Sequence, residues 1–153
     1  AREIDAATAV LAEQCLADRA NVRVVNRSGT EAGLPASDVI YVNAGAPGVI
    51  THWVDALADG GRLICPLTAG FEMGGMLLIT RKGIQFSARF TSRAAFIPCV
   101  GTEDPKSADA LRHAYQGGGW REVRSLVRAA PADSTCWLKG KGWWLSTRAL
   151  SPV

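Results

Sequence analysis

The sequence predicts an α/β protein with a mostly parallel sheet and an antiparallel hairpin at its C-terminal end. Helical and extended patterns alternate up to residue 67, which is typical of a parallel sheet. An almost uninterrupted apolar run at 38–42 is typical of a parallel strand that is buried on both faces. After residue 73 the apolar runs come in pairs around short turns, which indicates antiparallel hairpins.

The N-terminal stretch predicts the end of a strand, a helix and a second strand. Residues 1–5, AREID, have the character of a strand end. A helix is expected at 6–19, with Asp5 as its N-cap, because apolar residues recur there at helical spacing. The expected buried face of this helix consists of Ala7, Val10, Leu11 and Cys15. A strand is expected at 21–26, where β-branched residues alternate.

The middle of the chain predicts a second strand, helix and strand. The apolar strand at 38–42 leads into a loop of small residues, NAGAPG. Loops at the carboxyl ends of parallel strands commonly bind ligands. A helix is expected at 49–58 and a strand at 62–67.

The last part of the chain predicts mainly hairpins. MLLITRKGIQFSARF, at 76–90, consists of two apolar runs around Lys82 and Gly83. A helix is expected at 106–116, REVRSLVR is expected to form a strand or a short helix, and CWLKGKGWWLST is expected to form a tight hairpin. We expect two domains, a partial sheet domain at 1–100 and a C-terminal extension with a tryptophan-rich hairpin at 101–153.

The composition excludes several classes of protein. Of the 153 residues, 48% are hydrophobic and 20% are charged, which excludes a disordered chain. No apolar run reaches the roughly 18 residues of a membrane span and no secretion signal is found, so we expect a cytoplasmic protein without membrane contact. The net charge of +3 is small and Lys and Arg are scattered, which argues against nucleic-acid binding. The four cysteines match no zinc motif, and we expect no metal site.

One stretch has two interpretations. DVIYVNAGAPG, at 38–48, resembles the Asn-Ala-Gly turn of the short-chain dehydrogenases, which need a tyrosine and a lysine four residues apart for proton transfer. The downstream tyrosine is Tyr115, and the fourth residue after it is Gly119. The oxidoreductase interpretation therefore lacks its chemistry.

A second resemblance covers far more of the chain. The order of an acidic strand end, a helix, NVRVV, a glycine turn, DVIYVNAGAP, a helix containing WVDAL, and DGGRLICPL resembles the protein-L-isoaspartate O-methyltransferase family of class I S-adenosylmethionine-dependent methyltransferases. ARFTSRAAFIPCVG, GGWREVRSLVR and CWLKGKGWW resemble the later part of a bacterial branch of that family. The resemblance implies a Rossmann-like sheet, S-adenosylmethionine as cofactor, and a carboxylate of a protein or peptide as methyl acceptor.

The resemblance also implies which residues bind the cofactor. Glu3, or alternatively Asp5, would accept hydrogen bonds from the ribose hydroxyls, with Ile4 beside it. Ser28 and Gly29 would lie near the adenine, where the family has an acidic residue next to a glycine. Asn43, Ala44 and Gly45 would lie near the methionine part and the acceptor, although Gly45 equally fits a purely structural role in the turn.

No catalytic residue is assigned, and His52 is not expected to act as a base. A carboxylate nucleophile is already ionised, so methyl transfer to it depends on alignment and exclusion of water.

Two parts of the family pattern have no counterpart in the chain, the first strand and the glycine-rich loop after it. In the family this strand would lie between the strands at Glu3 and at 38–42, so we expect upstream residues, a second copy or a strand-donating partner to fill the gap. We therefore expect little or no activity from the chain by itself. The alternative is a non-catalytic interaction domain that binds or dimerises through its tryptophan-rich tail, which contains Trp120, Trp137, Trp143 and Trp144.

Overall fold

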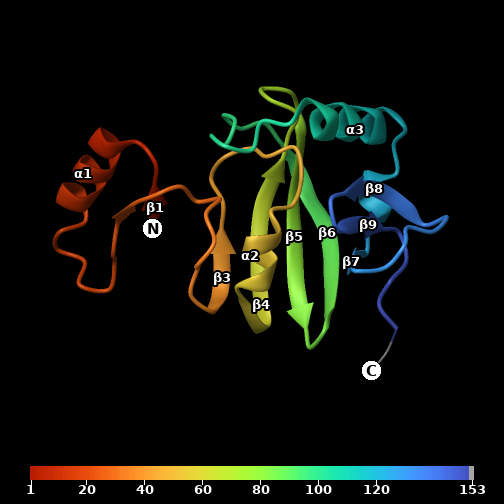
Figure 1. Cartoon of the computed structure of the whole chain (residues 1–153), viewed down its shortest axis with the longest axis horizontal. Coiled ribbons are helices and arrows are strands. Elements are labelled where there is room, and N and C mark those ends of the chain that lie inside the picture. The colour runs from red at the N-terminus through yellow and green to blue at the C-terminus, as the bar shows by residue number, and fades with distance from the viewer. Residues whose placement is uncertain (152–153) are drawn as a thin grey trace.

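The computed structural model describes residues 1–151, which form a small N-terminal lobe beside a larger sheet (Figure 1). The lobe has the two-stranded sheet β1-β2, and the main sheet has seven strands in the order β3-β4-β5-β6-β7-β9-β8. The strands are β1 Arg2–Glu3, β2 Val25–Asn26, β3 Ser37–Tyr41, β4 Leu57–Leu67, β5 Gly74–Lys82, β6 Gln85–Ala94, β7 Ser125–Arg128, β8 Cys136–Gly140 and β9 Trp143–Ser146. The helices are α1 Ala6–Cys15, α2 Thr51–Asp55 and α3 Pro105–Gln116, with a 3-10 turn, η1, at Trp120–Glu122.

In the lobe, α1 connects two short parallel strands. Asp5 caps the helix as predicted, because its Oδ1 accepts a hydrogen bond from the Thr8 amide at 2.7 Å. The expected buried face of this helix is wrong, since Val10 is 53% exposed and Leu11 is 59% exposed. The reason is that the two-residue strands β1 and β2 offer too little surface to cover an apolar helix face.

The strand β3 confirms the apolar strand predicted at 38–42, but it is not buried on both faces. It pairs in parallel with β4 alone, at one edge of the main sheet. Val39 is therefore 56% exposed and Tyr41 is 61% exposed. The helix α2 that follows is shorter than predicted, and it buries Trp53 and Val54.

The prediction of a mostly parallel sheet is wrong for residues 1–151. Only β1-β2 and β3-β4 pair in parallel, whereas β4-β5, β5-β6, β6-β7, β7-β9 and β8-β9 pair antiparallel. A parallel pair needs a long crossover connection, and after β4 the chain has short turns, as at Gly83 with φ +57°. Both hairpins that the sequence predicts are present, and these hairpins set the direction of most strands.

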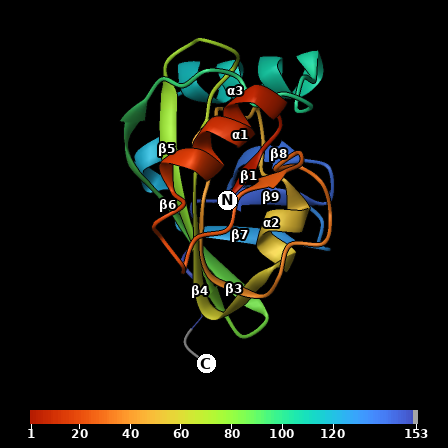
Figure 2. The same cartoon turned by 90° about the vertical axis from the view of Figure 1, so that its left-hand side faces the viewer.

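The main sheet curls around its own core. Figure 2 shows α2, β7 and β9 on the same side of the β3 to β6 part of the sheet. An ion pair between Asp55 of α2 and Arg128 of β7 joins these elements. Leu57, Leu63 and Leu67 of β4 and Leu145 of β9 are almost completely buried between them.

The tryptophans of the C-terminal part contribute to this core and do not form an exposed surface. Trp143 is 6% exposed and Trp144 is 5% exposed. Trp120 and Trp137 are half-buried and pack edge-to-face against Phe90, with ring centroids 5.7 Å and 5.3 Å away. The expected binding surface of the interaction-domain alternative is therefore absent from residues 1–151.

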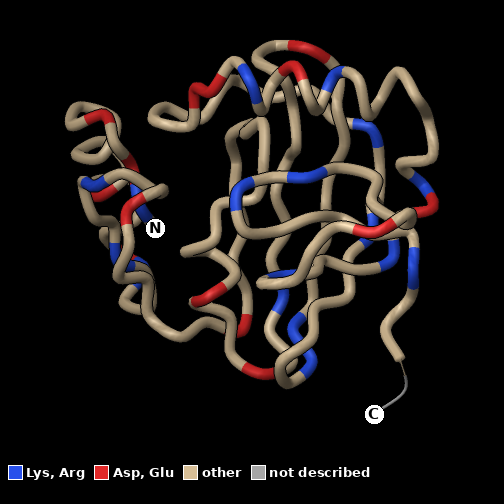
Figure 3. Tube along the Cα trace, turned by 45° about the vertical axis from the view of Figure 1, so that its right-hand side comes forward, with Lys and Arg blue, Asp and Glu red and all other residues tan. Residues whose placement is uncertain are grey.

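Charges are mixed over the surface. Figure 3 shows Lys and Arg spread over the lobe and the main sheet, interspersed with Asp and Glu. Among residues 1–151, no helix has the length and apolar character that crossing a membrane requires. The same residues contain no group of three or more His, Cys, Asp or Glu side chains able to hold a metal ion.

The burial of Trp143 leads to a stability prediction. Trp143→Ala is expected to lower the free energy of unfolding by about 3–5 kcal/mol, because it leaves a large cavity in the core, and to leave the association state unchanged. Urea unfolding and analytical ultracentrifugation measure the two quantities. Ile84→Ala is the control, since Ile84 is 93% exposed. Loss of association with unchanged stability would contradict the assignment of Trp143 to the core.

Candidate functional site

The lobe brings Glu3, Ile4, Ser28 and Gly29 to one edge of its small sheet. Because β1 and β2 are parallel with Glu3 opposite Asn26, both strands end at the same edge, and Ser28 follows two residues later. The Asn26 side-chain amide donates hydrogen bonds to the carbonyls of Glu3 at 2.9 Å and Ile4 at 3.1 Å. The strand pairing and these hydrogen bonds bring the predicted ribose-binding residues, Glu3 and Ile4, to the same edge as the predicted adenine-binding residues, Ser28 and Gly29.

Glu3 and Asp5 have different roles in the structure. Asp5 is engaged as the helix cap, and the hydrogen bond from the backbone amide of Thr8 lowers the pKa of its carboxyl. Glu3 is half-buried, and its Oε1 accepts a hydrogen bond from the Asp5 amide at 2.9 Å. A carboxylate has two oxygens with about four lone-pair sites, so Glu3 retains acceptor capacity for a ligand. The geometry favours Glu3 over the alternative Asp5.

The turn after β2 is built around an acid that sequence reasoning missed. The Glu31 carboxylate accepts hydrogen bonds from Nη2 of Arg27 at 2.7 Å and from the Ser28 amide at 3.3 Å. The hydrogen bond from Arg27 holds the pKa of Glu31 below its usual value. The Ser28 hydroxyl accepts a hydrogen bond from the Thr30 amide at 3.2 Å. Oppositely charged residues four apart, such as Arg27 and Glu31, are typical of a helix face, so the sequence gives no signal specific to this turn.

Asn43, Ala44 and Gly45 lie on the main sheet, where the chain continues beyond β3. The Gly45 amide donates to the Ile97 carbonyl at 2.8 Å, and the Cys99 amide donates to the Gly45 carbonyl at 2.7 Å. Asn43 is exposed, Ala44 is half-buried and Gly45 is buried. This loop therefore lies at the carboxyl end of β3, beside the segment 97–99.

The structure favours the structural role of Gly45. A Cβ at Gly45 would lie 2.0 Å from Oγ1 of Thr68, a residue with 0% exposure. The Thr68 hydroxyl has no hydrogen-bond partner among residues 1–151. Gly45 does not have a positive φ, so it makes room for Thr68 and does not serve a turn that only glycine can adopt. Neither Thr68 nor this contact had a signal in the sequence.

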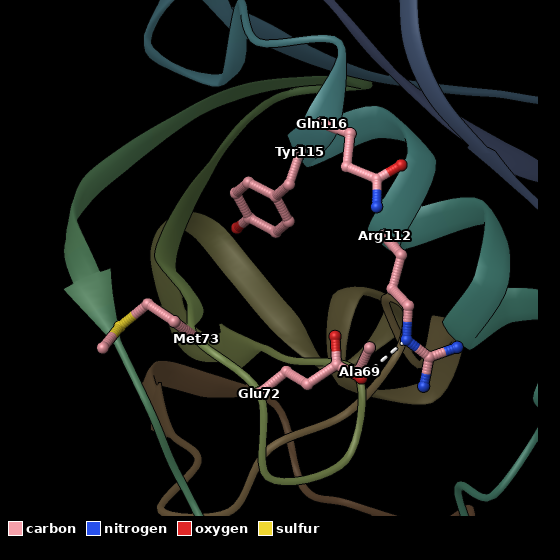
Figure 4. Close-up of a pocket in the computed structure, with 6 residues that line it drawn as sticks. All are labelled: Ala69, Glu72, Met73, Arg112, Tyr115 and Gln116. Carbon is pink, nitrogen blue, oxygen red and sulfur yellow. Dashed lines mark hydrogen bonds and ion pairs between the residues drawn. The ribbon is translucent and has the colours of Figure 1, made fainter.

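Two cavities are lined by other residues. One, of about 240 Å³, is formed by the β4-β5 loop and α3, where Glu72 and Arg112 form an ion pair at 2.7 Å (Figure 4). The other, of about 440 Å³, lies between the start of α2, the loop before α3 and the β8-β9 turn, and the exposed His52 is part of its wall. None of the seven predicted residues lines either cavity.

Tyr115, the tyrosine of the dehydrogenase interpretation, is part of the wall of the smaller cavity. Its ring packs edge-to-face against Phe90 and Trp137, and burial raises the pKa of its phenol. This environment makes Tyr115 a poor proton donor or acceptor.

Comparison with known proteins identifies the family. A family model described as "Protein-L-isoaspartate(D-aspartate) O-methyltransferase (PCMT)" matches residues 5–104. The chain belongs to this family. The match confirms the resemblance that the order of sequence motifs predicts, and it contains five of the seven predicted site residues, all except Glu3 and Ile4.

Curated relatives named protein-L-isoaspartate O-methyltransferase resemble part of the chain. The Methanocella arvoryzae protein is 40% identical over 84 residues, which cover 53% of this chain and 43% of that protein. The Korarchaeum cryptofilum protein is 36% identical over 84 residues, which cover 52% of this chain and 38% of that protein. The chain thus spans less than half the length of these relatives.

Solved structures share the fold. A protein-L-isoaspartate O-methyltransferase structure matches with a TM-score of 0.57 and 22% identity, over 75% of this chain and 37% of the other. A Plasmodium falciparum structure, described as a putative protein-L-isoaspartate O-methyltransferase in complex with S-adenosyl-L-homocysteine, matches with a TM-score of 0.57 and 18% identity, over 64% of this chain and 50% of the other. These matches confirm an α/β fold of the methyltransferase type.

The contact between Gly45 and Thr68 leads to a second prediction. Gly45→Ala is expected to destabilise the protein by about 1–3 kcal/mol through overpacking, and adding Thr68→Ala is expected to restore part of the loss by removing the clashing hydroxyl. Urea unfolding of both variants measures this coupling. Gly29→Ala is the matched control, because a Cβ there meets nothing within 4 Å. Equal stability of the Gly45→Ala and Gly29→Ala variants would refute the packing argument.

Proposed function

We propose that this chain is the cofactor-binding part of an S-adenosylmethionine-dependent methyltransferase that acts on isoaspartyl carboxylates of proteins or peptides. The observation that carries the proposal is the family match over residues 5–104. The S-adenosylhomocysteine in the Plasmodium falciparum structure supports the choice of cofactor. The 40% identical relative, which is named for this activity, supports the acceptor class.

The proposed reaction needs no side chain that moves a proton. When bound, the cofactor supplies a methyl group on a positively charged sulfonium. A carboxylate oxygen of the acceptor forms a bond to the methyl carbon while the carbon–sulfur bond breaks, which gives a methyl ester and S-adenosylhomocysteine. The protein contributes alignment and exclusion of water, in agreement with the exposure of His52.

The described residues fit the nucleoside end of the cofactor. Glu3 has free acceptor capacity for ribose hydroxyls at the edge where β1 and β2 end. Ile4, which is 48% exposed, offers an apolar surface beside it. Ser28 can make only a neutral hydrogen bond to the base, and Gly29 leaves open space for close approach.

The residues beyond β3 are proposed to face the reacting end. Asn43 and Ala44 would lie near the methionine part and the acceptor, and Gly45 would support this loop through its contact with Thr68. Within residues 1–151, the glycine-rich loop that follows the family's first strand has no counterpart, since the loop at 43–48 follows β3, Gly74 and Gly75 are within β5, and Gly117 to Gly119 follow α3. We therefore expect weak turnover from this chain by itself.

We propose that the chain pairs with one further β-strand. This strand would come from an additional segment, a second copy of the chain or another protein. In the described residues β1 pairs only with β2, and β3 pairs only with β4 on its inner side. Unpaired strand edges readily accept another strand. The exposed Val39 of β3 and Val10 and Leu11 of α1 are apolar surfaces that such a partner would cover.

A cytoplasmic location is proposed from the state of the cysteines. Cys15, Cys65, Cys99 and Cys136 are all free thiols, which is the usual state in a reducing compartment.

Calorimetric titration with S-adenosylhomocysteine tests the cofactor assignment. We expect binding in the micromolar range, and we expect Glu3→Gln to weaken it roughly 10- to 100-fold, because hydrogen bonds to a charged group contribute about 1.5–3 kcal/mol. Glu13→Gln is the matched control, since Glu13 is an exposed acid of α1 in the same lobe.

Transfer of labelled methyl to an isoaspartyl peptide, compared with the same peptide containing ordinary aspartate, tests the acceptor. The isoaspartyl peptide alone should be labelled, and addition of a strand-donating segment should raise the rate. Absence of both nucleoside binding and methyl ester would contradict the proposal.

A further inference from the structure

Arg2 forms hydrogen bonds to the turn at 28–33, which contains the residues proposed to contact the adenine. Its guanidinium Nη1 donates to the carbonyls of Glu31 at 2.9 Å and Ser28 at 3.3 Å, and Nη2 donates to the carbonyl of Gly33 at 3.0 Å. One side chain of β1 thus satisfies three backbone acceptors spread over residues 28–33. Fixing the backbone of one residue costs about 1–2 kcal/mol of conformational entropy. The hydrogen bonds from Arg2 offset part of this cost for the turn.

Trp53 reaches the same turn from the main sheet. Its indole Nε1 donates to the Gly29 carbonyl at 2.8 Å, and the side chain is 2% exposed. Trp53 belongs to α2, which packs against the core beside β4. The turn is therefore held from two directions, by β1 within the lobe and by α2 on the main sheet.

This double attachment bridges the two sheets. β1 and β3 are not hydrogen-bonded to each other, and they belong to separate sheets. Within residues 1–151, the hydrogen bond from Trp53 to Gly29 joins the lobe to a helix that is fixed to the main sheet. The position of Ser28 and Gly29 relative to Asn43 and Ala44 depends on such a bridge.

We infer that Arg2 and Trp53 are positioning residues for the nucleoside end of the proposed cofactor site. The inference rests on the proposed function for the identity of the ligand. Side chains of successive strand residues point to opposite faces, so Arg2 holds the turn while Glu3, the next residue, stays available to the ribose. Ser28 and Gly29 are then held at the edge where β1 and β2 end before the ligand arrives, which lowers the entropy cost of binding.

The two residue types suit this role. The planar guanidinium of arginine has five N–H donors in a fixed fork. Lysine has a compact ammonium on a flexible stem, so it cannot donate to three separated carbonyls at once. The indole of tryptophan is a donor only, so Trp53→Phe keeps an aromatic ring and removes the bond to Gly29.

Matched controls exist elsewhere in the chain. Arg81 donates to the carbonyls of Leu57 at 2.7 Å and Gly83 at 3.0 Å, and it lies on the β5-β6 hairpin. Trp137 donates from its indole to the Gly118 carbonyl at 2.7 Å, next to α3. Arg81→Lys and Trp137→Phe therefore remove the same kinds of bond at a distance from the proposed site.

Hydrogen exchange and calorimetry on the full chain test the inference. We expect Arg2→Lys and Trp53→Phe to speed amide exchange across residues 27–33 about tenfold, and to raise the dissociation constant for S-adenosylhomocysteine about tenfold, as loss of one to two hydrogen bonds predicts. Arg81→Lys and Trp137→Phe should change neither quantity, even where they lower overall stability. Circular dichroism verifies that all four variants are folded.

Each remaining outcome has a defined meaning. Equal exchange of the turn in the site variants and the controls would overturn the inference, as would faster exchange with an unchanged dissociation constant. If the unmodified chain binds no S-adenosylhomocysteine, the proposed function fails. Turn exchange then still decides whether Arg2 and Trp53 hold the turn.

Discussion

The strand β4 is the element on which the rest of the structure depends. It pairs in parallel with β3 on one edge and antiparallel with β5 on the other. Leu57, Leu63 and Leu67 along it are almost completely buried, and each buried leucine contributes roughly 1.5–3 kcal/mol of hydrophobic free energy. On its parallel side the chain needs the α2 crossover, and on its antiparallel side it can return through hairpins. The strand direction thus changes across β4, from the crossover connection on one side to hairpins on the other, and the family match at 5–104 covers both sides.

The candidate site depends on this arrangement, because its residues lie on both sheets. Glu3, Ile4, Ser28 and Gly29 share the edge of the lobe, whereas Asn43, Ala44 and Gly45 continue from β3 alongside β4. Arg2 fixes the turn at 28–33 within the lobe, and the hydrogen bond from Trp53 of α2 to Gly29 connects this turn to the main sheet. A site assembled in this way is sensitive to the contacts of a short turn as well as to the residues that touch the ligand.

Local patterns in the sequence predicted most helices and strands. They did not predict burial, which depends on contacts between residues far apart in the sequence. The cap at Asp5, the strand at 38–42 and both hairpins follow from spacing within a few residues, and all are present. The prediction of a buried face on α1 failed, because burial depends on whether a sheet face covers Val10 and Leu11. The alternative of an interaction domain required a tryptophan-rich binding surface, but β9 places Trp143 and Trp144 in the core.

The same limit applies to the site. The motif order predicted the family and therefore the seven candidate positions, which remain predictions at the level of single residues. No local pattern indicates that Arg2 contacts the turn at 28–33 or that Trp53 contacts Gly29. These are contacts between residues far apart in the sequence, and a residue type by itself does not reveal its distant partner.

The contact between Gly45 and Thr68 restricts the order in which these two positions can change during evolution. A side chain at position 45 would meet the Thr68 hydroxyl at 2.0 Å, so position 68 must first lose bulk before position 45 can gain it. The opposite order passes through an overpacked intermediate. Homologous chains with alanine or a larger residue at position 45 should therefore carry a smaller residue at position 68. The two positions should covary although they are far apart in the sequence.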